Sequence, residues 1–280
     1  MSQKGVSIEV IVVDDASTDD TCDVVESISD SRVKLLRSRI NGGPGAARNI
    51  GFATAKGKWI AVLDSDDYMN QNRLQNMLSK APTGADVLID NFCELSSDGA
   101  ISGPFYSSTE LPLGKLNLSF LIKTNLVFTK VKSTGYVKPL FKNEFVKNHS
   151  IKYWPEVKIG EDYYFLASCL ARGANAEVLN EAGYVYTVRD GSISSKLEID
   201  HIDKLLNFDK KFIREYHLSD LETSALKIRN KNLKRAFHYL VLIEQIKARR
   251  ILPALLNIIC NLPSALLLIL PIKKRLLFWK

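Results

Sequence analysis

Cysteine and histidine are scarce in this sequence, with four residues of each among 280. The cysteines Cys22, Cys93, Cys169 and Cys260 lie far apart, and none belongs to a CxxC pair. The sequence therefore argues against a disulfide framework and a cysteine-rich zinc site, and it fits a reducing compartment. Internal repeats and low-complexity segments are also missing, and the first residues lack the pattern of a secretory signal.

The overall composition is that of a globular protein, because hydrophobic residues make up 46% and charged residues 25%. This excludes a disordered, collagen-like or fibrous chain. The net charge of +7 is unevenly distributed. Residues 201–280 hold 16 Lys/Arg against 6 Asp/Glu, or +10, whereas the residues before them sum to −3. The C-terminal part is thus basic and apolar, whereas the rest of the chain is acidic. This distribution favours an anionic membrane surface as the partner, and no nucleic acid is expected to bind.

Apolar strand patterns alternate with amphipathic helix patterns along the first part of the chain. Short, β-branched runs predict buried strands at 8–13, 33–36, 59–63 and 86–90. Helical spacing predicts helices that open at 18–21 and that cover 46–55 and 73–78. This order indicates an α/β domain with a parallel sheet, in which ligands bind beyond the carboxyl ends of the strands.

Two of these expected strands end in acidic clusters. Asp64 and Asp66 follow the strand at 59–63, where their carboxylates converge and suit Mg²⁺ or Mn²⁺. A metal there would neutralise a diphosphate leaving group. The alternative is a solvated turn in which Asp67 caps a helix.

The second acidic cluster, Asp14 and Asp15, follows the first expected strand. One of its carboxylates can accept a hydrogen bond from an N–H group of a nucleotide base. The alternative is that both are turn residues.

Two further segments carry candidate functional groups. The glycine-rich turn at 41–45 leads into a helix with Arg48, which offers backbone N–H donors and a charge, but its spacing fits neither a P-loop nor a dinucleotide fingerprint. Glu161 and Asp162 precede an apolar helix. Alone they indicate a charge pair at a helix N-terminus, and with the other acidic clusters they can supply a general base.

In this order, the segments resemble the family 2 glycosyltransferases of the GT-A fold over about residues 8–200. The matching pieces are IEVIVVDDASTDDT, NGGPGAARNIG, GKWIAVLDSDDYM, GEDYYF and YVYTVRDGSIS. GGPGAARN, YVKPLF and RDGSIS look closest to the bacterial exopolysaccharide enzymes of the succinoglycan type. The resemblance implies a Rossmann-like, mostly parallel sheet flanked by helices, with a C-terminal helical extension. It also implies inverting transfer of a sugar from a UDP-sugar to a lipid-linked or polymeric glycan.

The resemblance assigns donor-binding roles to residues of the first part of the chain. Asp15 would contact the uracil, and Asp64 would hold nucleotide or sugar hydroxyls. Asp66 would bind Mn²⁺ or Mg²⁺ at the diphosphate. Arg48 and Asn49 would line the donor pocket.

The resemblance also assigns residues to the chemistry and to closure of the site. Asp162 would be the base that deprotonates the acceptor hydroxyl, with Glu161 as the alternative. Arg189 and Ser192 would close over the diphosphate.

Two other functions compete with sugar transfer. One is a catalytically dead relative that binds a glycan or a partner enzyme at the membrane. The other is a nucleotidyltransferase with a similar arrangement of carboxylates.

One departure from the family concerns its first strand, which lies in the middle of the sheet. Here the sequence starts just before the strand that is second in the family, so unpaired strand edges and an open core are expected. Three explanations are open. The start codon is miscalled, the gene is truncated, or another strand takes the place of the family's first strand.

The C-terminal part of the chain has a helical pattern at 201–250 and then 22 residues without charge, 251–272. This length can span a bilayer, but Pro253, Pro263 and Pro271 interrupt it and basic residues flank both ends. We therefore expect a broken, interfacial or re-entrant helix pair on the cytoplasmic face of the plasma membrane, with packing on the domain's own core as the alternative. The predicted organisation is a transferase domain at 1–200, a helical extension at 201–250 and a membrane-associating segment at 251–280.

Overall fold

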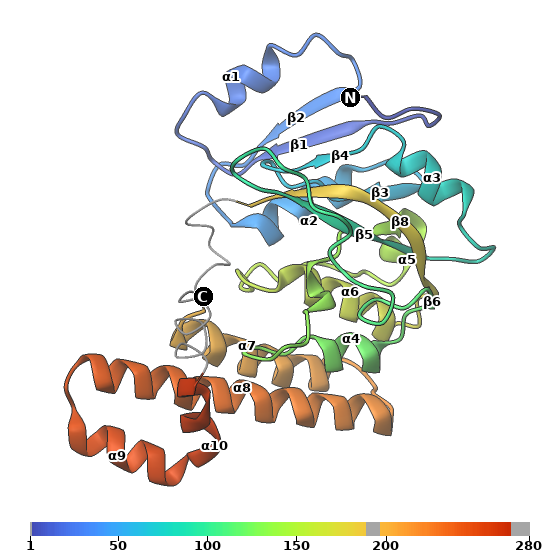
Figure 1. Ribbon diagram of the computed structural model, residues 1–280. Helices are drawn as coiled ribbons and strands as arrows, with labels where there is room; N and C mark the ends of the chain where they lie inside the picture. The colour runs from blue at the N-terminus through green and yellow to red at the C-terminus, as the bar shows by residue number, and fades with distance from the viewer. Residues whose placement is uncertain (1, 189–196, 270–280) are drawn as a thin grey trace. The chain divides into compact units, whose positions relative to one another are not determined.

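The computed structural model describes residues 2–188 and 197–269, which fall into two compact units (Figure 1). Of the described residues, the first unit comprises 2–121 together with 134–188, and the second comprises 122–133 together with 197–269. The short segment 122–133 therefore belongs with the C-terminal helices, although it is far from them in sequence.

The first unit contains the predicted alternation of strands and helices. Its strands are β1 (Val10–Asp14), β2 (Val33–Arg37), β3 (Trp59–Ala61), β4 (Tyr68–Met69), β5 (Val87–Leu95), β6 (Gly114–Lys115), β7 (Leu140–Lys142) and β8 (Ala176–Thr187). Its helices are α1 (Thr21–Glu26), α2 (Pro44–Thr54), α3 (Arg73–Ser79), α5 (Asn143–Asn148) and α6 (Glu161–Ala171), and α4 (Leu118–Thr124) runs across the division between the units.

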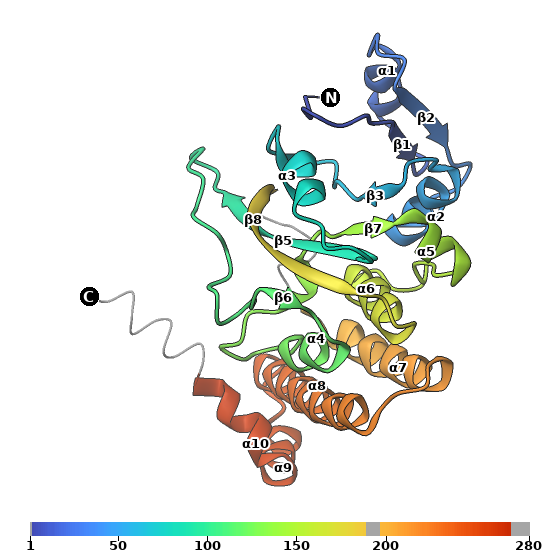
Figure 2. The same ribbon diagram turned by 90° about the vertical axis from the view of Figure 1, so that its right-hand side faces the viewer.

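The strands of the first unit form two sheets with mixed pairing directions (Figure 2). β1 and β2 are a parallel pair. The second sheet has the order β3-β7-β5-β8-β4, in which β5 and β8 are parallel and the other pairs are antiparallel. The antiparallel partners β4 and β7 are only two and three residues long, which is too short for an alternating pattern to predict.

The core of the first unit explains the continuous apolar runs in its sequence. Val87, Leu88 and Ile89 of β5 have no exposed surface, as expected for a strand that is covered on both faces. Helix α6 is buried on all sides from Tyr163 to Leu170. Rigid elements therefore position the acidic residues that begin α6 and that follow β3.

The second unit is a helical assembly that consists of α7 (Ile199–Glu215), α8 (Asp220–Lys247), α9 (Ile251–Cys260), α10 (Leu262–Ala265) and a 3₁₀ turn at Leu266–Leu268. Helix α8 begins with a capping box, because Ser219 N–H donates to Glu222 at 2.8 Å and Glu222 N–H donates back to the Ser219 hydroxyl. A buried ion pair links α7 to α8, with Arg229 Nε 3.0 Å from Asp209 Oδ2. Arg229 also donates to Asn125 and so ties the segment 122–133 to α8.

The apolar C-terminal segment forms two short helices instead of one long one. Among the described residues, no single helix has both the length and the apolar composition that a membrane crossing requires. The pair Ile251–Cys260 and Leu262–Leu268 meets that requirement only when taken together, and its two members are bent by 110°.

Candidate active site

Arg48 of α2 joins three carboxylates that come from distant parts of the sequence. Its Nη2 donates to Asp64 Oδ1 at 2.6 Å, just beyond β3. Its Nη1 donates to Glu161 Oε1 at 2.9 Å and to Asp162 Oδ1 at 3.0 Å, at the start of α6. Three of the sequence motifs therefore meet at one point. We call Arg48, Asp64, Glu161 and Asp162, together with Lys138, the ion cluster.

Lys138 supplies the second cation of the ion cluster. Its Nζ donates to Asp64 Oδ2 and to Asp162 Oδ2, both at 2.6 Å, and its side chain is only 7% exposed. Asp64 and Asp162 are thus bridged twice, once by Lys138 and once by Arg48. Such charge-assisted bonds are short and fix the orientation of both carboxylates.

A buried ion pair in the core holds the backbone of Lys138 in place. Arg73 donates from Nη2 to Asp90 Oδ1 at 2.6 Å and to the Lys138 carbonyl oxygen at 2.5 Å. Gly183 N–H donates to the same aspartate at 3.1 Å. A Cβ atom at position 183 would lie 2.6 Å from Arg73 Cγ, so only glycine permits this close approach.

The charges of the ion cluster shift the pKa values of its members. Burial alone would raise the pKa of Asp64, but the nearby charges of Lys138 and Arg48 outweigh it and hold the pKa below its usual range. Burial and the negative charge of Asp162 raise the pKa of Glu161, in spite of the contact with Arg48. The Lys138 ammonium is buried, yet its two carboxylate partners raise its pKa, so it stays charged. The ion cluster thus holds a persistent cation between Asp64 and Asp162.

Tyr153 and Asn49 surround the ion cluster. The Tyr153 hydroxyl donates to Asp162 Oδ1 at 3.3 Å, and the Arg48 guanidinium lies 5.4 Å from the centre of its ring. Burial, followed by the charge of Asp162, raises the pKa of Tyr153 well above its ordinary value, so it remains a donor. Asn49 bonds to the Tyr153 backbone in both directions at 2.8 Å. The structure therefore places Asn49 as a support of the Tyr153 segment.

Asp15 anchors the glycine-rich turn. Its two carboxylate oxygens accept hydrogen bonds from Gly42 N–H at 2.9 Å and from Gly43 N–H at 2.6 Å. Gly43 has a φ of 81° and Pro44 follows at the first position of α2, so the turn reverses direction and its N–H groups face Asp15. A carboxylate has about four lone-pair positions, so Asp15 keeps the capacity to accept a further donor.

The two acidic residues after Asp64 have different surroundings. Asp67 accepts hydrogen bonds from the Tyr184 hydroxyl at 2.6 Å and from Thr187 N–H at 2.8 Å, so it links the turn to β8 and caps no helix. Burial raises the pKa of Asp67 in spite of these bonds. Asp66 is exposed at the tip of the same turn. Among the described residues, no group of three or more His, Cys, Asp or Glu side chains is arranged to hold a metal ion by itself.

Sequence reasoning found most of the acidic residues of the site but not Lys138 or Tyr153. Lys138 lies within the YVKPLF segment, whose resemblance to exopolysaccharide enzymes was the one available signal. The predicted residues Arg189 and Ser192 lie outside the part of the chain that the structure describes.

Known proteins resemble this chain in both sequence and fold. The profile of glycosyl transferase family 2 matches residues 1–143. The chain is 41% identical over 278 residues to the succinoglycan biosynthesis protein ExoO of Rhizobium meliloti. The aligned region covers 99% of this chain and 80% of ExoO. It is 32% identical over 195 residues to the UDP-Glc:alpha-D-GlcNAc-diphosphoundecaprenol beta-1,3-glucosyltransferase WfaP of Escherichia coli, over 70% of this chain and 71% of WfaP.

Two solved structures share the fold at low sequence identity. TarS 1–349 of S. aureus in complex with UDP-GlcNAc has a TM-score of 0.64 at 24% identity, over 84% of this chain and 66% of that one. The mannosyltransferase PcManGT of Pyrobaculum calidifontis in complex with GDP-Man and Mn²⁺ has a TM-score of 0.57 at 17% identity, over 97% of this chain and 79% of that one. This likeness confirms the predicted fold class, a GT-A α/β fold with a C-terminal helical region.

The fold is that of a GT-A glycosyltransferase. More specifically, the chain belongs to glycosyl transferase family 2.

Proposed function

We propose that this glycosyltransferase moves a sugar from a UDP-sugar to a lipid-linked glycan during synthesis of a surface polysaccharide, with inversion at the anomeric carbon. The observation that carries the proposal is the double bridge between Asp64 and Asp162 by Arg48 and Lys138. It joins a carboxylate at the end of a strand, where ligands of α/β sheets bind, to a carboxylate that is suited to act as a base.

In the proposed reaction, Asp162 takes the proton of an acceptor hydroxyl. The hydroxyl oxygen then forms a bond to C1 of the sugar as the bond from C1 to the diphosphate oxygen breaks, and UDP leaves with the electron pair. We assign this role to Asp162 instead of Glu161 because Asp162 shares both cations with Asp64, whereas Glu161 hydrogen-bonds to Arg48 at 2.9 Å. Asp15 would accept from the uracil N–H, and Asp64 would hold a donor hydroxyl.

The residues present fit a divalent cation that is held jointly by the protein and the donor. Mg²⁺ and Mn²⁺ are commonly bound by one or two carboxylates plus substrate phosphate oxygens and water, so a full protein ligand set is not required. Asp66 offers such a carboxylate at the exposed tip of the turn after β3. When bound, the cation would stabilise the charge that develops on the UDP leaving group.

We expect Asp66→Ala to raise the Mn²⁺ concentration needed for half-maximal sugar transfer by about tenfold or more. The physical reason is the loss of the protein's exposed carboxylate ligand at the diphosphate. Transfer assayed over a Mn²⁺ series measures this shift. Asp98→Ala, which changes an exposed carboxylate in a surface turn, serves as the control and should leave the Mn²⁺ dependence unchanged. An Asp66→Ala curve that overlays the wild-type curve would remove Asp66 from the metal site.

The names of the relatives support the donor and acceptor classes. WfaP is named for transfer from UDP-Glc to a diphosphoundecaprenol-linked sugar, and a TarS structure contains UDP-GlcNAc. A test incubates the chain with Mn²⁺, a panel of UDP-sugars and diphosphoundecaprenol-linked sugars, and measures both UDP release and the glycolipid product. The proposal expects UDP release that depends on the acceptor. Transfer from a different nucleotide-sugar, with no reaction of any UDP-sugar, would contradict it.

A lipid-linked acceptor fits the exposed apolar surface of the second unit. One side of α9 packs on α8, where Asn257 Nδ2 donates to the His238 carbonyl oxygen at 3.2 Å and Ala254 is buried. The other side carries large apolar side chains in solvent, including Leu252 and Ile259, which are 69% and 74% exposed. A helix that is apolar on all sides needs a second apolar partner, and the acyl boundary of a membrane provides one.

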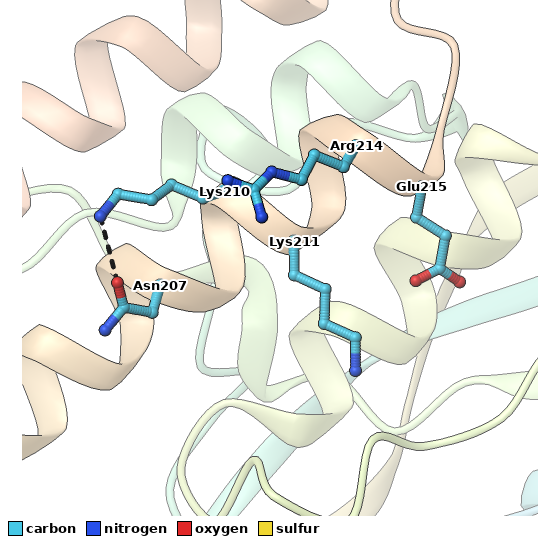
Figure 3. A pocket seen from close by; sticks show the side chains of 5 residues that line it. All are labelled: Asn207, Lys210, Lys211, Arg214 and Glu215. Atoms are coloured by element: carbon cyan, nitrogen blue, oxygen red, sulfur yellow. Dashed lines mark hydrogen bonds between the residues drawn. The ribbon is translucent and has the colours of Figure 1, made fainter.

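The second unit also carries exposed basic side chains. Arg249 and Arg250 are exposed immediately before α9. On α7, Lys210, Lys211 and Arg214 line a hollow of about 490 Å³ (Figure 3), in which Lys210 Nζ donates to Asn207 Oδ1 at 3.1 Å. Each cation near an anionic bilayer contributes about 1 kcal/mol of attraction. We therefore propose that the second unit rests on an anionic membrane surface.

We expect the triple substitution Leu252→Ser, Leu255→Ser and Ile259→Ser to weaken binding to anionic phospholipid vesicles by up to about a thousandfold. Each of these side chains contributes about 1.5 kcal/mol when fully buried, and 1.4 kcal/mol is a tenfold change in affinity. Vesicle flotation measures the bound fraction. The control removes exposed apolar side chains of the first unit (Val24, Ile28 and Ile40). Equal loss in both triple variants would contradict a specific membrane surface.

A further inference from the structure

The parallel strands β5 and β8 end together at one edge of the larger sheet, where Leu95 pairs with Thr187. Thr187 N–H donates to Asp67 at 2.8 Å, so this edge borders the turn that holds Asp64 and Asp66. Ligands of α/β sheets bind beyond the carboxyl ends of strands. The side chains at the ends of β5 and β8 therefore lie next to the turn of the proposed donor site, and the reaction proposed above does not use them.

Tyr186 lies on the face of β8 that is turned toward this acidic turn. Alternate residues of a strand point to the same side, so Tyr184 and Tyr186 share one face of β8. The Tyr184 hydroxyl reaches the turn, where it donates to Asp67 at 2.6 Å. Phe92 of β5 pairs with Tyr184, and its ring lies 6.2 Å from the ring of Tyr186. The ends of both strands therefore contribute aromatic rings to the same face.

The loop after β5 adds two aromatic rings beside Phe92. Phe105 stacks on Phe92 with a centroid distance of 4.6 Å, and Tyr106 packs edge-on against both rings. Asn91 fixes this loop, because its side chain accepts from Tyr106 N–H at 3.0 Å and donates to the Tyr106 carbonyl oxygen at 2.7 Å. Tyr106 is buried, whereas Phe105 and Tyr186 are partly exposed.

Tyr136 brings a further ring from the segment that carries Lys138. It ends a short 3₁₀ turn, Thr134–Tyr136, that packs on α6, the helix whose first turn supplies two carboxylates of the ion cluster. Tyr136 is 50% exposed, although it precedes the buried Lys138 by only two residues. Burial raises the pKa of Tyr136 and the nearby Tyr186 raises it further, so its hydroxyl stays protonated. We call Phe105, Tyr136 and Tyr186 the aromatic patch.

The order of the strands sets the aromatic patch apart from the proposed uracil contact at Asp15. β3 is the first strand of the larger sheet, and β5 and β8 lie beyond its partner β7 (Figure 2). β1 lies on the other side of β3, since Glu9 accepts from Lys56 N–H and Gly57 N–H at 2.7 Å, just before β3. Seen from the turn after β3, Asp15 and the aromatic patch are therefore on opposite sides.

This arrangement places the aromatic patch where an acceptor must approach. Inversion requires the acceptor oxygen to attack C1 from the side opposite the leaving diphosphate. With the uracil at Asp15 and the diphosphate at the turn after β3, the acceptor comes from the side of β5 and β8. The patch is also continuous with the proposed base, because Lys138, two residues from Tyr136, donates to Asp162 at 2.6 Å.

The chemistry of the aromatic patch suits a sugar ring. A pyranose ring presents a face of C–H groups that packs against the face of an aromatic ring, while its hydroxyls extend sideways. Tyr136 and Tyr186 each add a hydroxyl that can donate and accept. The three side chains of the patch are uncharged, so a free phosphate or an anionic headgroup would gain no ion pair from them.

On the basis of the proposed sugar transfer, we propose that the aromatic patch binds the pyranose ring of the acceptor's terminal sugar. Stacked on Tyr136 and Tyr186, this ring would present a hydroxyl toward Asp162. The patch is held by Asn91 and by the ends of two strands, so little conformational freedom is lost when the sugar binds.

Steady-state kinetics with a diphosphoundecaprenol-linked sugar as acceptor tests the proposal. Tyr136→Leu and Tyr186→Leu should each raise the KM for the acceptor by about tenfold, the effect of losing one aromatic stack of about 1.4 kcal/mol. The KM for the UDP-sugar should change by less than about twofold, because the patch lies away from the uracil contact. Tyr136→Phe keeps the ring and should hold the acceptor KM within about threefold of wild type.

Tyr68→Leu is the matched control for the loss of an exposed tyrosine. Tyr68 is 38% exposed, but it pairs with Val185 and so lies on the opposite face of the sheet from Tyr186. Its replacement should leave the acceptor KM unchanged. An equal rise of the acceptor KM in Tyr68→Leu and Tyr136→Leu, or a wild-type acceptor KM in both patch variants, would overturn the proposal.

Saturation-transfer NMR measures acceptor binding without any turnover. The probes are the methyl β-glycosides of glucose, galactose and N-acetylglucosamine, added together with UDP and Mn²⁺. Saturation of their ring C–H protons should fall by at least about fivefold in Tyr136→Leu and in Tyr186→Leu. If the wild-type chain transfers sugar to no acceptor, the proposed function fails, yet this measurement still decides the patch. Equal saturation in wild type and both variants, or none in wild type, contradicts it.

Discussion

Replacing Lys138 with methionine is expected to reduce the turnover rate of sugar transfer by about a hundredfold to a thousandfold. Removing one preorganised electrostatic donor from an active site has an effect of this size. In this site the ammonium bridges Asp64 and Asp162 at 2.6 Å each, so its loss leaves two carboxylates in partial burial without their shared cation. Steady-state kinetics should show a larger change in kcat than in the KM for the donor, because Lys138 orients Asp162.

The controls for Lys138 separate its role in the ion cluster from a general loss of stability. Breaking a buried ion pair destabilises a protein by about 3–5 kcal/mol, so thermal unfolding of each variant must be recorded. Lys138→Arg keeps the charge and should retain more turnover than Lys138→Met at similar stability. Lys142→Met removes a lysine of the same segment that lies 3.4 Å from Asp86 and is 29% exposed, and it should change turnover little. A folded Lys138→Met protein with wild-type kcat would contradict the assigned role.

Asp162→Asn is expected to lower kcat by about a thousandfold or more while the affinity for UDP changes little. A positioned general base contributes about 10²–10⁴ to rate, and asparagine cannot accept the acceptor's proton. Glu161→Gln should lower kcat by less than about tenfold, because Glu161 bonds to Arg48, whereas Lys138 and the Tyr153 hydroxyl bond to Asp162. Product formation at saturating donor measures both effects.

The comparison of these two carboxylate variants decides between the two candidate bases. Glu156→Gln, which alters an exposed glutamate a few residues earlier, is the matched surface control and should retain wild-type kcat. If Glu161→Gln loses activity and Asp162→Asn keeps it, the base is Glu161. Burial and the charge of Asp162 raise the pKa of Glu161, which would suit it to that role.

Sequence patterns singled out the acidic residues that the structure brings together at Arg48. Buried parallel strands end at a common edge, so carboxylates directly after such strands are expected to converge. Asp64 follows β3, which pairs antiparallel with β7, and Arg48 brings it together with Glu161 and Asp162 at the start of α6. The order of helices and strands up to β5, except for the two-residue strand β4, was predicted from the apolar period that each element carries.

Lys138 could not be predicted from local pattern. It follows an irregular stretch and precedes the three-residue strand β7, so no periodicity gives its direction. Its placement depends on Arg73, which binds its carbonyl oxygen, and on the approach that Gly183 permits. Asn49 illustrates the same limit, since its partner is the backbone of Tyr153, more than one hundred residues away. Contacts of this kind are set by tertiary packing.

Calorimetric titration of UDP into the 280-residue chain, first with Mn²⁺ and then with EDTA, tests most directly whether this site binds a uridine diphosphate donor. We expect UDP to bind with Mn²⁺ and its affinity to fall by at least about tenfold in EDTA, because the cation would link the diphosphate to the protein. Folded protein that binds no UDP in the presence of Mn²⁺ would contradict the account.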